Sequence, residues 1–166
     1  NYAESVRCAE TGGYRLDRFA DVLDLCLGRI KLDVELKEAG YEDAVLRSLA
    51  DAGWQPADFV ATSFELSAIP RLKAANPEVR VGLLVCDMSS QAAVDLFREL
   101  RADFLGPDVQ MLDPSLRRES ESSGIELMPW TVNDPDVIRD LLTWPSVSGI
   151  ITDDPVVARD IRDAGL

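Results

Sequence analysis

The chain has 166 residues, of which 46% are hydrophobic and 28% are charged, so it can enclose about one hydrophobic core. It carries 30 acidic and 17 basic residues, and the formal net charge of −13 disfavours binding to nucleic acid and to anionic membrane surfaces. No apolar run is long enough to span a membrane. Histidine is absent, which excludes a Ser-His-Asp or Cys-His arrangement and an imidazole zinc site within these residues.

Strands and helices are expected to alternate along the chain. After a short N-terminal piece, helical spacing of apolar residues predicts a helix over 18–27, and strict alternation predicts a strand over 29–37. The same signals, with glycine and proline stops, place the later elements. They predict helices over 41–52, 65–75, 89–100 and 114–122, and strands over 58–64, 79–86, 103–106, 124–132 and 147–153.

Three Asp-Pro pairs are expected to begin helices. Asp113-Pro114, Asp134-Pro135 and Asp154-Pro155 recur at spacings of 21 and 20 residues. Aspartate is a favoured N-cap and proline a favoured first helical residue, so capping accounts for all three pairs. Their spacing sets the register of successive strand–helix units. Six strands that alternate with helices imply parallel pairing through right-handed crossovers.

The first predicted strand favours one parallel architecture over another. Leu32, Val34 and Leu36 lie on its apolar face and should meet helices, whereas Asp33, Glu35 and Lys37 lie on the other face and point inward. Six strands fit either a doubly wound sheet or part of a barrel, but a central strand of an open sheet is apolar on both faces. The prediction is therefore an α/β fold of the (β/α)8 TIM-barrel type, a single domain over 1–166. A complete barrel takes about 250 residues, so this one is incomplete, with about six βα units.

Several strings in this chain resemble the glycerophosphodiester phosphodiesterase family, in order and at plausible spacing over about residues 14–166. Lys31 to Lys37 resembles the family's Glu-x-Lys strand, and Tyr14 to Leu25 resembles the helix before it. Thr62 to Phe64 is similar to the family's Ser-Ser-Phe strand end, and Gly82 to Leu84 to the Gly-x-Leu strand that follows. Trp130 to Asn133 and Gly149 to Pro155 resemble the last two strands.

This resemblance implies a TIM-barrel hydrolase of lipid metabolism. Its members are phosphoric diester hydrolases that convert glycerophosphodiesters to glycerol 3-phosphate and an alcohol, assisted by Mg²⁺ or Ca²⁺. The family's two catalytic histidines and its Glu-x-Asp pair are missing here, with the first two strands that carry them. Residues 2–10 resemble the helix after the family's first strand, which predicts a deletion or a missing stretch near residues 9–14.

Two residues of the Glu-x-Lys string are the candidate catalytic residues. Glu35 would be a metal ligand, and Lys37 would bind the substrate phosphate, where its charge offsets the charge that develops during attack. Spacing alone favours an interior ion pair instead, either Glu35 with Lys37 or Asp33 with Lys31, and the resemblance shifts the balance toward the metal role. Glu35 is expected to open into the top of a closed ring of parallel strands and to face a phosphate-sized cavity.

Two aromatic residues at strand ends, Phe64 and Trp130, are candidates for substrate binding. They would line the pocket for the glycerol or the alcohol, although plain packing inside the barrel explains them equally well.

Three functional hypotheses remain open. The first is metal-dependent hydrolysis of a small-molecule glycerophosphodiester. The second is a catalytically inactive barrel-like domain that binds a metabolite or a protein partner. The third, an unrelated barrel enzyme, would need acid–base groups from Asp, Glu or Lys alone. Exposed edge strands recruit other strands, so a homodimer is also expected. The compartment is not determined, with a cytoplasmic location slightly favoured.

Overall fold

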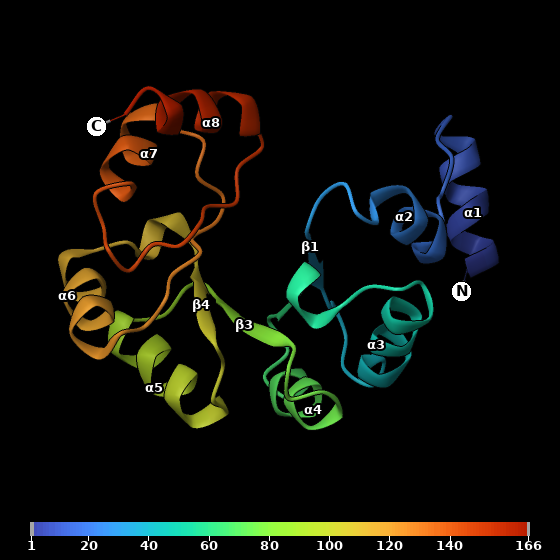
Figure 1. The fold of residues 1–166 in the computed structure, drawn as a ribbon, viewed down its shortest axis with the longest axis horizontal. Coiled ribbons are helices and arrows are strands. Elements are labelled where there is room, and N and C mark those ends of the chain that lie inside the picture. The colour runs from blue at the N-terminus through green and yellow to red at the C-terminus, as the bar shows by residue number, and fades with distance from the viewer. Residues whose placement is uncertain (1, 166) are drawn as a thin grey trace.

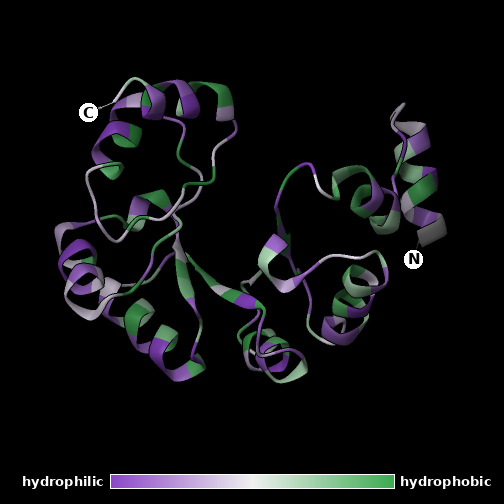
Figure 2. Ribbon diagram, viewed as in Figure 1, coloured by the Kyte–Doolittle hydropathy of each residue, from purple (hydrophilic) through white to green (hydrophobic). Residues whose placement is uncertain are grey.

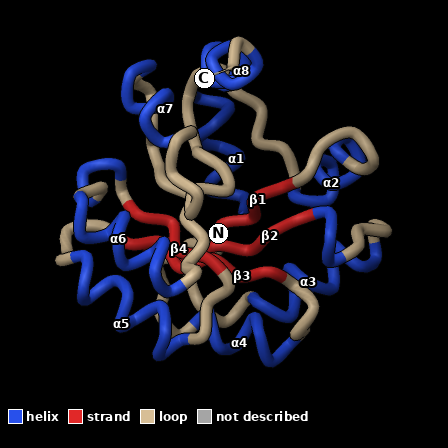
Figure 3. The backbone as a smooth tube through the Cα atoms, turned by 60° about the vertical axis from the view of Figure 1, so that its left-hand side comes forward, coloured by secondary structure: helices blue, strands red, loops and turns tan. Residues whose placement is uncertain are grey.

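A computed structural model describes residues 2–165 as an arc of parallel strands with helices around its outer side (Figure 1). The strands are β1 (Leu32–Glu35), β2 (Phe59–Ser63), β3 (Arg80–Val85) and β4 (Phe104–Pro107), and they lie side by side in that order. All three neighbouring pairs are parallel. The helices α3 (Glu42–Asp51), α4 (Ala68–Ala75) and α5 (Ser90–Leu100) follow successive strands and lie on the outer side (Figure 3).

Two extended segments continue the arc in the fifth and sixth strand positions. Isolated parallel bridges join Leu105 to Leu127 and Leu127 to Val147. The predicted strands over 124–132 and 147–153 are thus extended in place but do not form continuous ladders. Pro129 in the fifth segment has no N–H to donate, which interrupts that ladder. The helices α6 (Pro114–Ser123), α7 (Pro135–Leu141) and α8 (Pro155–Asp163) complete the six βα units expected from the sequence.

The strands form an open arc, so the expectation of a closed ring was wrong. β1 pairs with β2 on one side, and the sixth segment hydrogen-bonds to the fifth through Ser148 N and Leu127 O at 3.1 Å. The opening separates the N-terminal half from α7 and α8 (Figure 1). A closed barrel of this type has eight strands, and six positions leave the opening unfilled. β1 is also shorter than the predicted strand over 29–37, because its outer edge has no neighbour to extend the ladder.

The N-terminal part consists of α1 (Tyr2–Thr11) and α2 (Phe19–Cys26), which lie beside the opening. Residues 9–14, where the sequence predicted a missing stretch, form a hydrogen-bonded turn in which Tyr14 N donates to Ala9 O at 2.8 Å. Two short 3₁₀ helices, η1 (Pro56–Asp58) and η2 (Val109–Met111), complete the described elements. Across residues 2–165, no helix is both long and apolar enough to cross a bilayer.

The hydrophobic core lies between the strands and the helices outside them. Leu83 and Leu105 are fully buried at its centre, and apolar residues line the strands and the inward sides of the helices (Figure 2). Leu36 is buried in this layer, and Leu32 and Val34 pack against it, so the apolar face of the first predicted strand meets the core as expected. This outer layer is continuous across all four strands even though the ring is open.

The three Asp-Pro pairs cap helices, as predicted. Asp113 accepts a hydrogen bond from Leu116 N at 2.7 Å, Asp134 from Asp136 N at 2.8 Å, and Asp154 from Val157 N at 3.1 Å. In each helix the proline occupies the first turn, where its missing N–H costs nothing. The caps fix where each helix begins after its strand.

A close contact inside the arc gives a test of this packing. A Cβ atom at Gly82 would overlap the ring of Phe104, so Gly82→Ala should lower the free energy of unfolding by about 1–3 kcal/mol. Gly149→Ala is the matched control, because its nearest neighbour, Met128 Cε, is 3.8 Å away and leaves room for a methyl group. Urea denaturation of both variants measures the difference, and equal stabilities would contradict this packing of β3 against β4.

Candidate active site

The predicted catalytic pair lies at the carboxyl end of β1. Glu35 is the last residue of the strand, and Lys37 follows two residues later. The Lys37 Nζ atom lies 2.6 Å from Glu35 Oε1, and the side chains are 76% and 29% exposed, respectively. Of the two ion pairs that spacing left open, Glu35 with Lys37 is therefore formed. Asp33 accepts a hydrogen bond from Thr62 Oγ1 at 2.7 Å.

A buried serine at the end of β2 holds the chain between these two residues. Ser63 Oγ donates to Leu36 O at 2.6 Å and accepts from Glu65 N at 3.0 Å. Leu36 N also donates to Thr62 O at 2.8 Å. Because both polar groups of Leu36 are bonded to β2, the backbone that carries Glu35 and Lys37 is fixed. Ser63 is thus a structural contact rather than a nucleophile.

The site does not fit a divalent metal ion with the described residues alone. Glu35 Oε1 is buried and makes no hydrogen bond, and the Lys37 ammonium group is its close cationic neighbour. Mg²⁺ and Ca²⁺ need at least six ligand oxygens between protein, water and substrate, and one carboxylate holds them weakly. Within residues 2–165, no group of three or more acidic or cysteine side chains is placed to hold a metal.

Glu35 and Lys37 line a small pocket between the end of β1 and the helices α2 and α3. Its volume is about 330 Å³, and Phe19, Tyr41 and Val45 form its apolar side. The pair therefore faces a cavity bounded by helices rather than the top of a closed ring. The pocket is open to solvent next to Lys37, which accounts for the exposure of the Lys37 side chain.

The two aromatic candidates contact each other at the carboxyl ends of their strands. The ring centroids of Phe64 and Trp130 are 5.3 Å apart, at an angle of 85° that is typical of an edge-to-face contact. Trp130 Nε1 donates to Gly106 O at 2.8 Å, which fixes the indole on β4. Phe64 remains 40% exposed. The pair spans the interior of the arc and forms an apolar wall at its mouth.

The last two segments are tied together at the same end by a contact that the sequence did not predict. Asn133 Nδ2 donates to Asp153 Oδ2 at 2.7 Å, and Asn133 Oδ1 accepts from Asp153 N at 2.9 Å. Asn133 thus bonds to a residue 20 positions away along the chain. The sequence held one indication of this contact. Parallel strands end at the same edge of a sheet, so the turns after the fifth and sixth segments both lie at the mouth.

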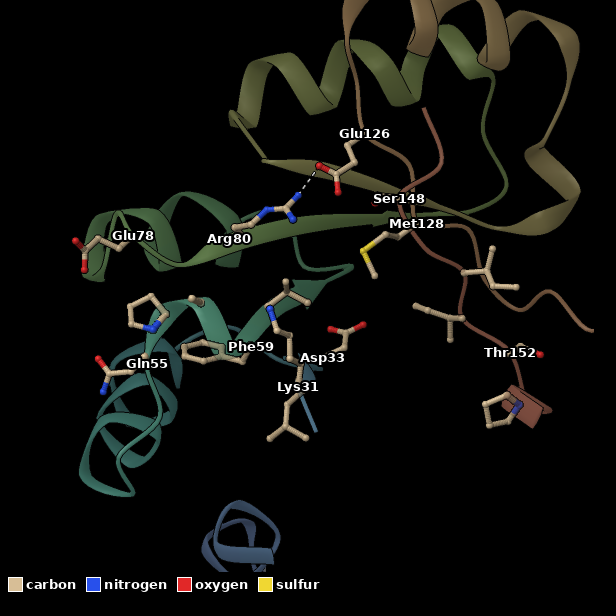
Figure 4. Close-up of a pocket in the computed structure, with 17 residues that line it drawn as sticks. Lys31, Asp33, Gln55, Phe59, Glu78, Arg80, Glu126, Met128, Ser148 and Thr152 are labelled. Atoms are coloured by element: carbon tan, nitrogen blue, oxygen red, sulfur yellow. Dashed lines mark hydrogen bonds and ion pairs between the residues drawn. The ribbon is translucent and has the colours of Figure 1, made fainter. Parts of the chain in front are cut away.

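A much larger cavity of about 1080 Å³ lies along the opening, toward the amino ends of the strands. On one wall Arg80 pairs with Glu126 at 2.6 Å, and Lys31, Asp33 and Phe59 form the other (Figure 4). Of the predicted site residues, none lines this cavity. The cavity exists because the arc is open. The apolar and polar pattern of the six units therefore could not predict it.

Asp33, in the wall of this cavity, has a perturbed ionisation. Burial raises the pKa of its carboxyl group above the ordinary value of 3.8, the hydrogen bond from Thr62 opposes the shift, and the charge of Glu35 adds to it. The folded protein therefore binds a proton here at a higher pH than the unfolded chain does. The resulting stabilisation is present at low pH and is lost as pH rises through the raised pKa.

Comparison with Asp33→Asn tests this ionisation. As pH falls from 7 toward 4, the wild-type chain should gain free energy of unfolding relative to the variant, which has no carboxyl group to protonate. Chemical denaturation of both proteins across this range measures the difference. A difference that stays constant with pH would show that the pKa of Asp33 is not raised.

Comparisons with known proteins agree on one family. A sequence model described as the glycerophosphoryl diester phosphodiesterase family matches residues 24–157. No curated protein matches the chain. The structure is similar to that of a candidate glycerophosphoryl diester phosphodiesterase from Silicibacter pomeroyi, with 26% identity and a TM-score of 0.75, covering 93% of this chain and 59% of the other.

Two more distant structures share the fold. A glycerophosphodiester phosphodiesterase from Parabacteroides distasonis has 19% identity and a TM-score of 0.77, covering 92% of this chain and 67% of its own. A phosphodiesterase from Oleispira antarctica, in complex with the product sn-glycerol-3-phosphate, has 22% identity and a TM-score of 0.69, with coverage of 80% and 55%. The chain thus spans less than two thirds of the Silicibacter pomeroyi protein that it resembles.

Proposed function

The chain belongs to the glycerophosphoryl diester phosphodiesterase family, and on that premise we propose that it supplies the greater part of a barrel that hydrolyses glycerophosphodiesters. The products would be glycerol 3-phosphate and an alcohol. The observation that carries the proposal is the family match over residues 24–157, which includes Glu35 and Lys37 at the carboxyl end of β1. In a barrel of this type, that end of the strands is where catalysis takes place.

Lys37 is proposed to bind the phosphate of the diester. Its side chain is the more exposed partner of the pair, so the ammonium group can turn from Glu35 toward an anion in the neighbouring pocket. A fixed positive charge there stabilises the charge that develops on the phosphate oxygens during attack. Glu35 limits the mobility of Lys37 in the absence of substrate.

A divalent metal ion, Mg²⁺ or Ca²⁺, belongs to this proposal with Glu35 as one ligand. When bound, such an ion would polarise the phosphate. The described residues do not complete its ligand shell, so Glu35 by itself would not retain it. The role of Glu35 in this chain alone is to neutralise and orient Lys37.

Phe64 and Trp130 are proposed to line the pocket for the glycerol or the alcohol. Their edge-to-face contact leaves part of the Phe64 ring exposed at the mouth, where it can cover the carbon atoms of a substrate. The hydrogen bond from Trp130 to Gly106 holds the wall in one position.

An inactive barrel-like domain that binds a metabolite or a protein is the second candidate. The observation that favours it is the absence of histidine from all 166 residues, because general acid–base catalysis needs a group that titrates near neutral pH. The homodimer expected from the sequence stays a prediction, and the net charge of −13 on each copy opposes it.

An assay of the chain alone tests whether its own residues are sufficient for hydrolysis. The purified protein should not release choline from glycerophosphocholine above the buffer rate with either Mg²⁺ or Ca²⁺, because proton transfer supplies about 10²–10⁴-fold of such a rate. Robust turnover that is abolished by Glu35→Ala would contradict this expectation and show that Asp, Glu or Lys performs the acid–base step.

Binding of the product tests the phosphate site that is proposed at Lys37. Titration calorimetry with sn-glycerol 3-phosphate should detect binding to the wild-type chain, and Lys37→Met should weaken it about tenfold, as expected for loss of a charge-assisted hydrogen bond. Arg118→Met, which removes the same charge from the exposed face of α6, is the control and should bind like the wild type. A wild-type chain that binds no glycerol 3-phosphate would contradict the proposed phosphate site.

A further inference from the structure

A single buried hydroxyl group lies between the two parts of the proposed site. Ser63, the last residue of β2, is fully buried. Its Oγ atom donates to Leu36 O at 2.6 Å and accepts from Glu65 N at 3.0 Å. Leu36 directly precedes Lys37 in the chain, and Phe64 directly follows Ser63. The two bonds therefore reach the backbone beside Lys37 and the backbone beside Phe64.

On the side of β1, the hydroxyl group adds one bond to the pairing of the two strands. Leu36 N donates to Thr62 O at 2.8 Å. In a parallel ladder, a backbone N–H of the neighbouring strand would be the next donor to Leu36 O, and here Ser63 Oγ donates to that oxygen. Because the Lys37 side chain is 76% exposed and little packing restrains it, its position depends on this backbone anchor and on the ion pair with Glu35.

On the side of β2, the same hydroxyl group turns the chain out of the strand. A serine that accepts from the N–H group two residues later forms a short turn, and Phe64 lies in the bend at its centre. The centroid of the Phe64 ring is 5.3 Å from that of Trp130. The turn at Ser63 therefore sets where the Phe64 ring meets the indole.

We propose that Ser63 is a positioning residue that sets Lys37 and Phe64 relative to each other. The inference rests on the function proposed above, in which Lys37 binds the phosphate and Phe64 covers the carbon atoms of the substrate. One oxygen atom makes both bonds, so the ends of β1 and β2 cannot move apart without breaking one of them. A hydroxyl group suits this position because it is a donor and an acceptor at one buried atom.

Two substitutions of the same shape separate the effect of the hydroxyl group from that of packing. Ser63→Thr keeps the hydroxyl group and adds a methyl group, whereas Ser63→Val has the same shape without a hydroxyl group. Titration calorimetry with sn-glycerol 3-phosphate should give a dissociation constant at least about fivefold higher for Ser63→Val than for Ser63→Thr, as expected for the loss of one hydrogen bond. Circular dichroism and urea denaturation confirm that both variants are folded.

A second buried serine controls for a general loss of stability. Ser120 in α6 is also fully buried, and its Oγ atom donates to Arg117 O at 2.9 Å. Ser120→Ala should lower stability without changing the affinity for sn-glycerol 3-phosphate, whereas Ser63→Ala should lower both. If the added methyl group unfolds Ser63→Thr and Ser63→Val, this pair of alanine variants decides between the two results.

Two measurements on the free protein report on the two bonds separately. Exchange of the Leu36 amide, measured by NMR, should be at least about fivefold faster in Ser63→Val than in Ser63→Thr. The near-ultraviolet circular dichroism of Ser63→Val should approach that of Phe64→Leu, which removes the contact with Trp130. Ser63→Thr should retain both wild-type signals.

The outcomes distinguish this inference from the proposed function. Equal affinities of Ser63→Thr and Ser63→Val, or an equal loss of affinity in Ser120→Ala and Ser63→Ala, would overturn the role of Ser63 and leave the phosphate site in place. A wild-type chain that binds no sn-glycerol 3-phosphate would contradict the phosphate site instead. The free-protein measurements then decide on Ser63, because its role stands only if both signals change in Ser63→Val.

Discussion

The hydrogen-bond ladder of a parallel barrel stabilises every strand from two sides, and in this arc the first and last positions have a neighbour on one side only. β2, β3 and β4 are buried along most of their length, whereas β1 is half exposed and only four residues long. The sixth segment is extended and hydrogen-bonds to the fifth, for example from Ile151 N to Pro129 O at 2.9 Å, but it forms no continuous strand ladder. The burial of the strands and the regularity of their pairing therefore decrease from the centre of the arc toward its two edges. Both edges border the opening.

The position of Glu35 and Lys37 follows from this constraint. Glu35 and Lys37 belong to the edge strand, so β2 has to hold them, through Ser63 and Thr62. Glu35 Oε1 makes no hydrogen bond, and the Lys37 ammonium group forms an ion pair with it. The ion pair therefore lies in the pocket that α2 and α3 border, beside the end of β1.

Most of the fold was predictable because its signals are local. Period-two and helical patterns located the six units, and the Asp-Pro caps at Asp113, Asp134 and Asp154 marked the helix starts. The continuity of the outer strands was not predictable, because a ladder depends on a neighbour that no local pattern describes. Similarly, the sequence placed Glu35 next to Lys37 and left their pairing open, while the bond of Asn133 to Asp153 depends on two turns that meet only in the folded arc.

The fold and the proposed site therefore depend on different layers of this molecule. The layer between strands and helices, centred on Leu83 and Leu105, is continuous over the whole arc. The inner layer is not, because its side chains from β1 face the opening instead of a neighbouring strand. The mouth of a barrel collects residues from many strands, and this arc of six brings Phe64 and Trp130 together there.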